Sequence, residues 1–355
     1  MKILITGNMG YIGPTVAQRL RKSYSKAQII GLDMGYFATC LTASKCLPEC
    51  RVDSQYFSDV RHTDPIILKD VDAIVYLAAI SNDPMGATFE NVTLDVNYRA
   101  AIDLAEQARR QGARSFVFAS SCSVYGSGGE DAKTEDSSLN PLTAYAKSKI
   151  AAEQELARLA DPTFVVTCLR FATACGMSER LRLDLVLNDF VASALATGTI
   201  TILSDGTPWR PLIHITDMAR AIDWGVQRSF QDGGHFVAVN AGSDEWNYQV
   251  RDLAQAVAKV ISGVDVQVNQ NAQPDKRSYR VSFEKFRQLA PAYQPKIDLH
   301  AAIEDIKRGL ESMNFRDPNF RSSQLIRLNV LKALKEGGYL NEDLSWNEWP
   351  KSLIA

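Results

Sequence analysis

Residues 2–13 read Lys2-Ile3-Leu4-Ile5-Thr6-Gly7-Asn8-Met9-Gly10-Tyr11-Ile12-Gly13. The first five form a short, largely apolar run that ends at glycine, which is typical of a buried parallel strand. The glycines let the backbone turn tightly and approach a pyrophosphate, whose charge is stabilised by the N-terminus of the following helix. We expect that helix over residues 11–22. The stretch therefore predicts a strand–turn–helix unit that binds a dinucleotide.

The same alternation continues along the chain. Further strands are expected at residues 28–32, 73–79, 115–119, 164–169, 199–203 and 236–240, and helices at 97–111, 143–159, 186–197, 217–228 and 248–260. Strands separated by helices predict an α/β fold with a Rossmann-type, doubly wound parallel sheet and a smaller, interleaved lobe.

We expect three parts in this order. A dinucleotide-binding domain spans residues 1–169 and is completed by 212–242, a substrate-binding lobe takes 170–211 and 243–310, and a helical C-terminal extension takes 311–355. Leucines recur every third position in the extension and predict one packed helix face; they are Leu325, Leu328, Leu331 and Leu334.

Composition excludes several classes of protein. The 355 residues hold 39 Lys+Arg and 41 Asp+Glu, a net charge of -2, so no nucleic-acid partner or anionic membrane surface is expected. No stretch approaches the roughly 20 apolar residues of a membrane helix, and the N-terminal apolar run is too short for a signal peptide. Six sparse cysteines favour reduced thiols and a cytoplasmic enzyme, and the four scattered histidines give no metal site.

Asp33 determines the predicted cofactor. It ends the second expected strand, 20 residues after Gly13, where a carboxylate can accept hydrogen bonds from both hydroxyls of an adenosine ribose. Met34 and Gly35 follow it, so the 2′-phosphate of NADP would meet a negative charge without an arginine. NAD is favoured, and the alternative is a solvated acid at a strand end.

A second group of residues carries acid–base chemistry. Tyr145 and Lys149 are at i and i+4 of an expected helix and share a face. A lysine ammonium near a phenol stabilises the phenolate, which would lower the tyrosine pKa toward the range of a general base. Ser121 follows a buried strand upstream and could hydrogen-bond the substrate oxygen that Tyr145 deprotonates.

At this point the chain resembles the extended short-chain dehydrogenases/reductases, in the nucleotide-sugar epimerase/dehydratase group. The resemblance covers most of residues 1–290 and rests on several motifs that follow one another along the chain in the same order as in the family. These are the glycine run, Asp59-Val60, Tyr76-Leu77-Ala78-Ala79, Asn97, residues 120–126, Asn140-Pro141, residues 145–149 and residues 210–217.

The resemblance implies roles in the cofactor site. Asp59 would bind the adenine amino group, Val60 would pack beside it, Lys149 would hold the nicotinamide ribose, and Phe171 would meet the nicotinamide amide. Other residues would line the same groove; they are Gly7, Gly10, Tyr11, Ile12, Gly13, Leu77, Ala78, Ala79, Ala119 and Tyr145. Asn97 belongs either to this site or to a tie between a helix and a strand.

Substrate contacts follow from the same resemblance. Arg210 would grip the diphosphate of a sugar nucleotide, unless it forms a surface ion pair, and Arg277 is a weaker candidate for that task. Further substrate contacts are expected at Ser81, Ser121, Thr173 and Asn188. Family dehydratases carry an Asp-Glu pair, and decarboxylases a glutamate, where this chain has Cys122 and Ser123. A thiol and a hydroxyl are poor general acids, so these positions resemble the 4-epimerases.

The leading hypothesis is an NAD-dependent epimerase of a nucleoside-diphosphate hexose, most simply at C4, with Ser121, Tyr145 and Lys149 as catalytic residues. Alternatives are a nucleotide-sugar reductase, dehydrogenase or dehydratase of the same family, and a non-catalytic NAD-binding regulatory protein. The resemblance also implies a homodimer through the helices at 97–111 and 143–159. Their alanines would permit close approach; these are Ala100, Ala101, Ala105, Ala108, Ala144, Ala151 and Ala152.

Overall fold

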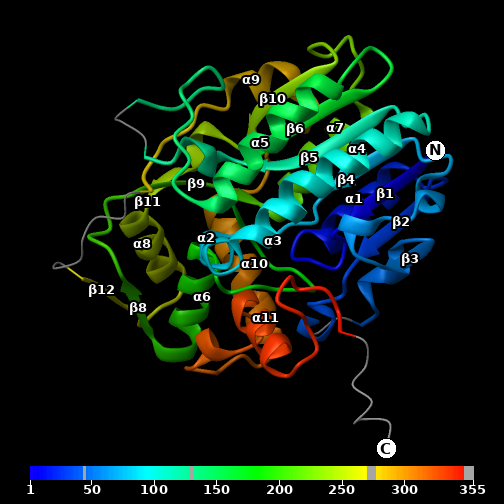
Figure 1. Ribbon diagram of the computed structural model, residues 1–355. Helices are drawn as coiled ribbons and strands as arrows, with labels where there is room; N and C mark the ends of the chain where they lie inside the picture. Colours follow the sequence, from blue (N-terminus) through cyan, green and yellow to red (C-terminus); the bar gives the residue numbers. More distant parts are fainter. Residues whose placement is uncertain (43–44, 128–130, 270–276, 348–355) are drawn as a thin grey trace, which may run out of the picture.

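The computed structural model describes residues 1–42, 45–127, 131–269 and 277–347. Its central layer is a seven-stranded sheet in the order β10-β6-β5-β4-β1-β2-β3 (Figure 1). The strands are β1 Lys2–Thr6, β2 Gln28–Asp33, β3 Ser54–Phe57, β4 Ala73–Tyr76, β5 Ser115–Ser121, β6 Val165–Phe171 and β10 Phe236–Ala241. Every neighbouring pair is parallel, which confirms the predicted α/β fold with a doubly wound sheet.

Helices cover both faces of this sheet. The α-helices are α1 Gly13–Ser23, α2 Asp83–Thr88, α3 Glu90–Leu94, α4 Ala100–Arg110, α5 Ala144–Leu159, α6 Val186–Thr197, α7 Ile215–Gln227, α8 Val250–Val260, α9 Glu284–Leu289, α10 Leu299–Ser312 and α11 Arg327–Glu336. A π-helical turn, η5 Asp95–Arg99, joins α3 to α4. Short 3-10 turns are η1 Ala38–Cys40, η2 Pro48–Arg51, η3 Val60–His62, η4 Pro65–Leu68, η6 Cys122–Tyr125, η7 Asp244–Trp246, η8 Pro291–Tyr293 and η9 Phe320–Ser322.

Strand side chains alternate between two hydrophobic clusters. Ile3 and Ile5 point to the face covered by α1 and α7, whereas Leu4 points to the face covered by α4 and α5. In Figure 1, α4 and α5 lie side by side over the sheet. Burial on both faces explains why these strands read as continuous apolar runs in the sequence.

The alanines of α4 pack against the chain's own sheet. Ala100, Ala101, Ala105 and Ala108 are at most 2% exposed and belong to the cluster beneath α4 and α5. Ala152 of α5 is buried in the same cluster. These five alanines cannot make the predicted contact with a partner chain, because the sheet already covers them, whereas Ala144 and Ala151 are half-buried and the dimer itself stays a prediction.

Two small sheets accompany the second half of the chain. One has the order β11-β9-β7, with β7 Thr173–Cys175, β9 Trp209–His214 and β11 Asn247–Gln249; the other pairs β8 Thr199–Ile202 with β12 Asp265–Val268. The first hydrophobic cluster runs without a break from α1 to α6, α8 and α10. The predicted boundaries between dinucleotide-binding domain, substrate lobe and extension stay a prediction.

Several elements end elsewhere than the sequence predicts. β4 stops at Tyr76, three residues before the predicted end of its strand, because the chain leaves the sheet there. β3 was not predicted; its four residues are half-buried or exposed and lack an apolar run. In the extension, Leu331 is fully buried on α11, but Leu325 lies before that helix.

A buried polar network joins the strands below the carboxyl edge of the sheet. Arg170 of β6 forms an ion pair with Glu153 of α5 (Nη2–Oε2 2.7 Å), and both are at most 6% exposed. Arg170 Nη1 also donates to the Tyr125 hydroxyl, which donates to Asn240 of β10 (2.7 Å). Paired charges of this kind hold the strand ends in fixed register, since a lone buried charge would be costly.

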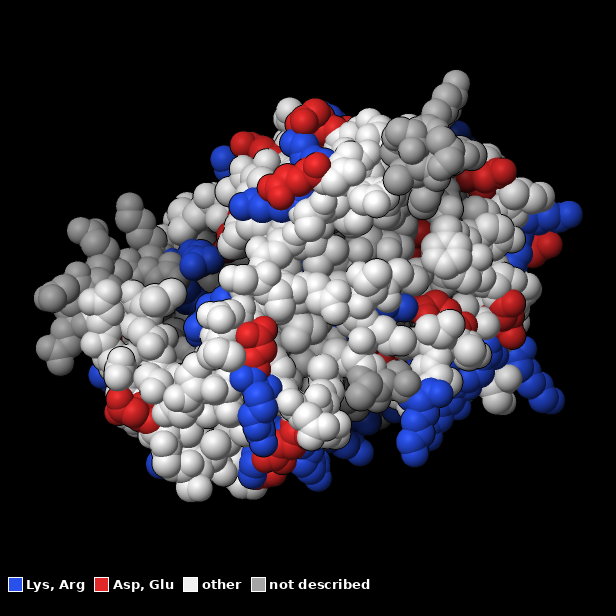
Figure 2. Space-filling model, turned by 90° about the horizontal axis from the view of Figure 1, so that it is seen from below, with Lys and Arg blue, Asp and Glu red and all other residues white. Residues whose placement is uncertain are grey.

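Charged side chains are mixed on the surface. Figure 2 shows acidic and basic residues interspersed around a largely uncharged middle, in keeping with 39 basic and 41 acidic residues. Among the described residues, no helix combines the length and the apolar character needed to cross a membrane.

Candidate active site

One large cavity opens along the carboxyl edge of the sheet. It has a volume of about 1080 Å³, the upper end of the usual range for ligand sites. The loops that follow β1, β2, β4 and β5 all line it, as do α5 and β7. Most predicted site residues meet there; they are Gly7, Gly10, Tyr11, Ile12, Asp33, Asp59, Val60, Leu77, Ala78, Ala79, Ser81, Ala119, Ser121, Tyr145, Lys149, Phe171, Thr173, Arg210 and Arg277.

The glycine turn lines one side of the cavity. Gly7 has φ +72°, and a Cβ on it would lie 2.6 Å from the backbone nitrogen of Ala78. A Cβ on Gly13 would lie 2.0 Å from the carbonyl oxygen of Asn8, so glycine is required for the close packing of α1. The helix N-terminus thus faces the cavity, which suits the diphosphate of a dinucleotide.

Asp33 is held in place by two backbone donors. Its carboxylate accepts hydrogen bonds from the N–H groups of Met9 (3.0 Å) and Gly35 (2.7 Å). Burial raises the pKa of Asp33, and these hydrogen bonds partly offset that effect. The second lone pairs of the carboxylate oxygens can accept from a ribose diol.

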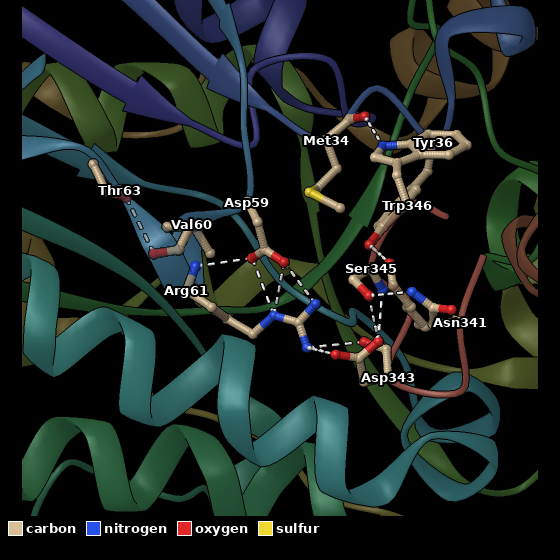
Figure 3. A network of polar contacts seen from close by, with 11 residues as sticks. Met34, Tyr36, Asp59, Val60, Arg61, Thr63, Asn341, Asp343, Ser345 and Trp346 are labelled. Atoms are coloured by element: carbon tan, nitrogen blue, oxygen red, sulfur yellow. Dashed lines mark hydrogen bonds and ion pairs between the residues drawn. The ribbon is translucent and has the colours of Figure 1, made fainter. Parts of the chain in front are cut away.

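The adenine end of the groove is formed by Asp59 and Val60. Asp59 caps the η3 turn and accepts from Arg61 through the backbone N–H (2.9 Å) and through Nη2 (2.6 Å). Figure 3 shows the two side chains facing each other, with Val60 beside them. Opposite, Leu77 and Ala78 turn away from β4, and their N–H groups donate to Thr6. Asp59, Val60, Leu77 and Ala78 all line this end of the cavity.

Asn97 ties three segments together. It is fully buried, accepts from the Ile80 N–H (2.8 Å) and donates to the Ile80 carbonyl (3.1 Å) and to Ser148 of α5 (3.1 Å). It does not line the cavity, so of the two roles that the sequence left open, the geometry supports the tie. The π-helical turn that carries it is a feature common at functional sites.

Tyr145, Ser121 and Lys149 form the reactive centre. Thr143 caps α5 and accepts from the Ala146 N–H (3.2 Å), which starts the helix just before Tyr145. The Ser121 hydroxyl lies near enough to the Tyr145 hydroxyl to lower the tyrosine pKa, and Ser121 Oγ accepts a hydrogen bond from the Ser123 N–H (3.1 Å). Lys149 Nζ lies 5.6 Å from the centre of the Tyr145 ring and 4.6 Å from that of Phe118.

Burial determines the titration of this centre. It raises the pKa of Tyr145 to about 12, although the hydrogen bond to Ser121 lowers it, and it lowers the pKa of Lys149 to about 7. The effect of Lys149 on the tyrosine pKa stays a prediction, because burial is the largest cause of the raised Tyr145 pKa and Lys149 is itself only partly protonated near neutral pH.

Two arginines lie at the other end of the cavity. Arg210 of β9 donates through Nη1 to the carbonyls of Trp209 (2.9 Å) and Arg277. Arg277 forms an ion pair with Asp83 at the start of α2 (2.7 Å). Both arginines line the cavity, and Asp83, the partner of Arg277, accepts a hydrogen bond from Thr143 (2.8 Å), two residues before Tyr145. Their guanidinium groups can meet phosphate oxygens in the cavity.

Asn188 is placed differently from its predicted role. It is fully buried, and its side chain accepts from the Gly176 N–H (3.1 Å) and donates to the Tyr11 hydroxyl and the Arg182 carbonyl (both 3.0 Å). It does not line the cavity. The expected substrate contact of Asn188 is corrected to a structural role, because its amide is already satisfied by three groups of the chain.

Asp83, Arg182 and Asp184 are among the polar residues of the cavity that sequence reasoning missed. Asp83 could have been noticed, since Asn82-Asp83-Pro84 is a helix-start pattern in which Asn82 caps α2. Arg182 and Asp184 form a nearly buried ion pair (2.7 Å) across from Ser81, whose hydroxyl accepts from Arg182 (2.9 Å). No sequence pattern marks that pair, because only the tertiary fold brings it to the site.

Comparison with known proteins agrees with this geometry. Residues 3–242 match the family described as the NAD dependent epimerase/dehydratase family. A UDP-glucose epimerase of Bacillus subtilis strain 168, described as uncharacterized, is 30% identical over 231 residues, which are 62% of this chain and 71% of the relative. UDP-glucose 4-epimerase of Neisseria meningitidis serogroup A is 28% identical over 270 residues, 68% of this chain and 77% of the relative.

A solved structure shows the same fold. UDP-glucuronic acid 4-epimerase from Bacillus cereus, in complex with UDP-glucuronic acid and NAD, has a TM-score of 0.74 at 23% identity. The match covers 88% of this chain and 100% of that chain.

The burial of Lys149 predicts an unusual stability change. Lysine in the unfolded chain has a pKa of about 10.4, whereas burial lowers the pKa of Lys149 in the folded chain to about 7. Between these two pH values the unfolded chain binds more protons than the folded chain. The free energy of unfolding therefore rises with pH across this window. Lys149→Met should therefore raise the thermal midpoint of nucleotide-free protein by about 2–6 °C at neutral pH, with a smaller gain near pH 10. Differential scanning calorimetry measures this. The exposed neighbour Lys147, changed to Met, serves as the control, and a lower midpoint for Lys149→Met at every pH would contradict the prediction.

Proposed function

The chain belongs to the NAD-dependent epimerase/dehydratase family, and we propose that it inverts C4 of a nucleoside-diphosphate hexose with NAD as its cofactor. The single observation that carries this proposal is that Ser121, Tyr145 and Lys149 line one cavity, which is large enough for two ligands. The glycine turn, Asp33 and Asp59 fit the dinucleotide, and Arg210 and Arg277 fit the diphosphate of the sugar nucleotide.

The proposed chemistry begins with a proton transfer at Tyr145. Its phenolate takes the proton of the C4 hydroxyl, and Ser121 donates a hydrogen bond that stabilises the charge developing on the same oxygen. Bound NAD supplies the two-electron acceptor that takes hydride from C4 and later returns it. Lys149 orients the cofactor ribose beneath Tyr145.

Inversion requires the sugar to present its other face. Arg210 and Arg277 hold the diphosphate at the far end of the cavity, so the 4-keto sugar can turn about that anchor without leaving. Returning hydride to the opposite face, with the proton from Tyr145, gives the epimer. Over one cycle the sugar loses and regains one proton and one hydride, so no net oxidation takes place.

The residues after Ser121 argue against water elimination. Cys122 is 1% exposed, its Sγ donates to the Arg170 carbonyl (3.1 Å), and burial raises its pKa. Ser123 lines the cavity as a hydroxyl. Neither position provides a carboxylic acid, which supports epimerisation over dehydration.

We further propose a homodimer, through the outward faces of α4 and α5 and not through the buried alanines. Leu94, Tyr98 and Ile102 form a half-exposed apolar line along α3, η5 and α4. Ile150 and Ala151 of α5 are likewise half-exposed beside it, since these elements are packed together. Two neighbouring apolar faces of this kind suit a contact between identical copies.

A cytoplasmic location is also proposed. It is supported by four buried cysteines that are thiols; they are Cys40, Cys122, Cys168 and Cys175. Thiols of this kind persist in a reducing compartment.

The role of Asp33 predicts the choice of cofactor. NAD should bind at least about tenfold more tightly than NADP, because a 2′-phosphate would meet the carboxylate. Asp33→Asn should narrow that difference, whereas the exposed Asp64→Asn should leave it unchanged. Isothermal titration of both cofactors is the measurement, and equal affinity of the parent protein for the two would count against the assignment.

The hydride cycle predicts no net change in cofactor. With a panel of UDP-, GDP-, CDP- and dTDP-hexoses followed by NMR, one pair should interconvert without a steady rise in NADH absorbance at catalytic amounts of NAD. Tyr145→Phe should lose roughly 10²–10⁴-fold in rate. It should still bind the nucleotide sugar, because Arg210 and Arg277 remain. NADH accumulating in step with product would place the protein among the sugar-nucleotide dehydrogenases.

The proposed dimer should dissociate when a charge is placed in its apolar contact, and not when a charge is changed elsewhere on α4. Sedimentation equilibrium at micromolar concentration should give twice the mass of one chain, and Tyr98→Asp should shift the protein to monomer by placing a charge in the apolar line. Arg110→Asp, at the exposed end of α4, should stay dimeric. A monomeric parent protein would refute the proposal.

A further inference from the structure

The chain after residue 326 returns to the adenine end of the cavity. α11 lines the cavity through Arg327, Leu328 and Leu331, and the residues after it reach the loops that follow β2 and β3. In Figure 1 this orange-to-red segment lies beside the blue loops of the N-terminal strands. We refer to residues 339–347 as the strap.

The strap is fixed to the loop after β2 by Trp346. Its indole Nε1 donates to the Met34 carbonyl (2.8 Å), one residue beyond Asp33. The ring lies 5.6 Å from that of Tyr36, whose hydroxyl donates to the Leu344 carbonyl. Figure 3 shows Trp346 beside Tyr36 and directed at Met34. The loop that walls the ribose end of the groove is thus held from outside by the chain's own C-terminal part.

A chain of charges joins the strap to Asp59. Arg61 forms its two-pronged pair with Asp59, and its Nη1 donates to the Asp343 carbonyl (2.8 Å) with the Asp343 carboxylate 3.6 Å away. Figure 3 shows the guanidinium lying between the two aspartates. The residue expected to bind the adenine amino group is therefore held in place by an arginine that also binds the strap.

Apolar contacts hold the strap against the loop after β4. Leu344 is fully buried and Leu340 is 3% exposed. They form a separate hydrophobic cluster with Leu331 of α11 and with Ile80 and Met85 beyond β4. The strap therefore contacts the loops after β2, β3 and β4, which are the three walls of the adenosine half of the groove.

Arg327 brings an uncompensated charge to the same cavity. It is 2% exposed, its Nη2 donates to the Arg180 carbonyl (2.6 Å), and its Nη1 has no hydrogen-bond partner among the described residues. Burial lowers its pKa, and the positive charge of Arg182 lowers it further. Its two arginine neighbours have carboxylate partners, Glu49 for Arg180 and Asp184 for Arg182. The guanidinium lies over the Phe37 ring (4.7 Å), and the carboxylate that acts on it, that of Asp184, is already paired with Arg182. A buried guanidinium whose Nη1 lacks a hydrogen-bond acceptor is costly, and a bound phosphate would supply one.

We propose that the C-terminal part of the chain completes the dinucleotide site. Arg327 binds the diphosphate, and the strap holds together the loops that wall the adenosine half, so that the cofactor leaves only when the strap releases those loops. This inference rests on the proposed NAD site and adds residues that lie beyond the matched family region, 3–242. A strap of this kind would keep NAD bound over many turnovers of a reaction that does not consume NAD.

The rate of NAD release tests the strap directly. Full-length protein is loaded with isotope-labelled NAD and chased with excess unlabelled NAD. Trp346→Ala, which removes the bond to Met34 and the contact with Tyr36, should release the label at least about tenfold faster. Arg327→Met should weaken NAD binding at equilibrium by about 10–100-fold, as expected for a lost charged hydrogen bond.

A matched control lies on the strap itself. Glu342 pairs with Lys335 (2.6 Å) and is 89% exposed, so Glu342→Gln breaks an ion pair of the strap away from the cavity and should release NAD at the parent rate. Amide hydrogen exchange of residues 339–347 should slow when NAD is bound, which tests the idea without any substitution. The proposal would be overturned if Trp346→Ala releases NAD at the parent rate and if NAD leaves the amide hydrogen exchange of residues 339–347 unchanged. A parent chain that binds no NAD would instead overturn the proposed function.

Discussion

The close approach of two backbones at Gly7 is the constraint on which the site depends. β1 and β4 are neighbours in a parallel sheet, and the turn after β1 passes so near Ala78 that any side chain at Gly7 would collide with it. Parallel strands end at one edge, so the loops after β1, β2, β4 and β5 converge there. Because the turn is compact, those loops enclose one continuous cavity in which cofactor and sugar nucleotide can meet.

Burial shapes the chemistry of that cavity at a cost to stability. Tyr145 has a pKa of about 12 and Lys149 a pKa of about 7, both moved by loss of water. Arg327 carries the same kind of penalty at the cofactor end. Groups held against their preferred ionisation are typical of functional sites, because ligands supply the charges that the protein lacks. Paired networks such as Arg170 with Glu153 keep the surrounding frame rigid.

Short motifs of neighbouring residues are the part of the site that the sequence predicts. The glycine run, the acid at Asp33 and the Tyr145–Lys149 spacing are short patterns with fixed geometry, and the structure brings all of them to the cavity. Features that depend on the tertiary environment were not predictable in this way: the amide of Asn188 is satisfied inside the core, the α4 alanines face the sheet, and burial raises the pKa of Tyr145. The strap could not be foreseen, since its contacts with Met34 and Arg61 join residues about 300 positions apart, as in the 312-residue separation between Trp346 and Met34.

The central claim is that one hydrogen leaves a sugar carbon and returns to its opposite face within a single active site. The most direct measurement uses a nucleoside-diphosphate hexose deuterated at C4, followed by NMR in ordinary water. The account predicts that the epimer keeps the deuterium at the inverted C4, because the hydrogen travels as hydride and never exchanges with solvent. Product with protium at C4, or deuterium accumulating in the reduced cofactor, would contradict it.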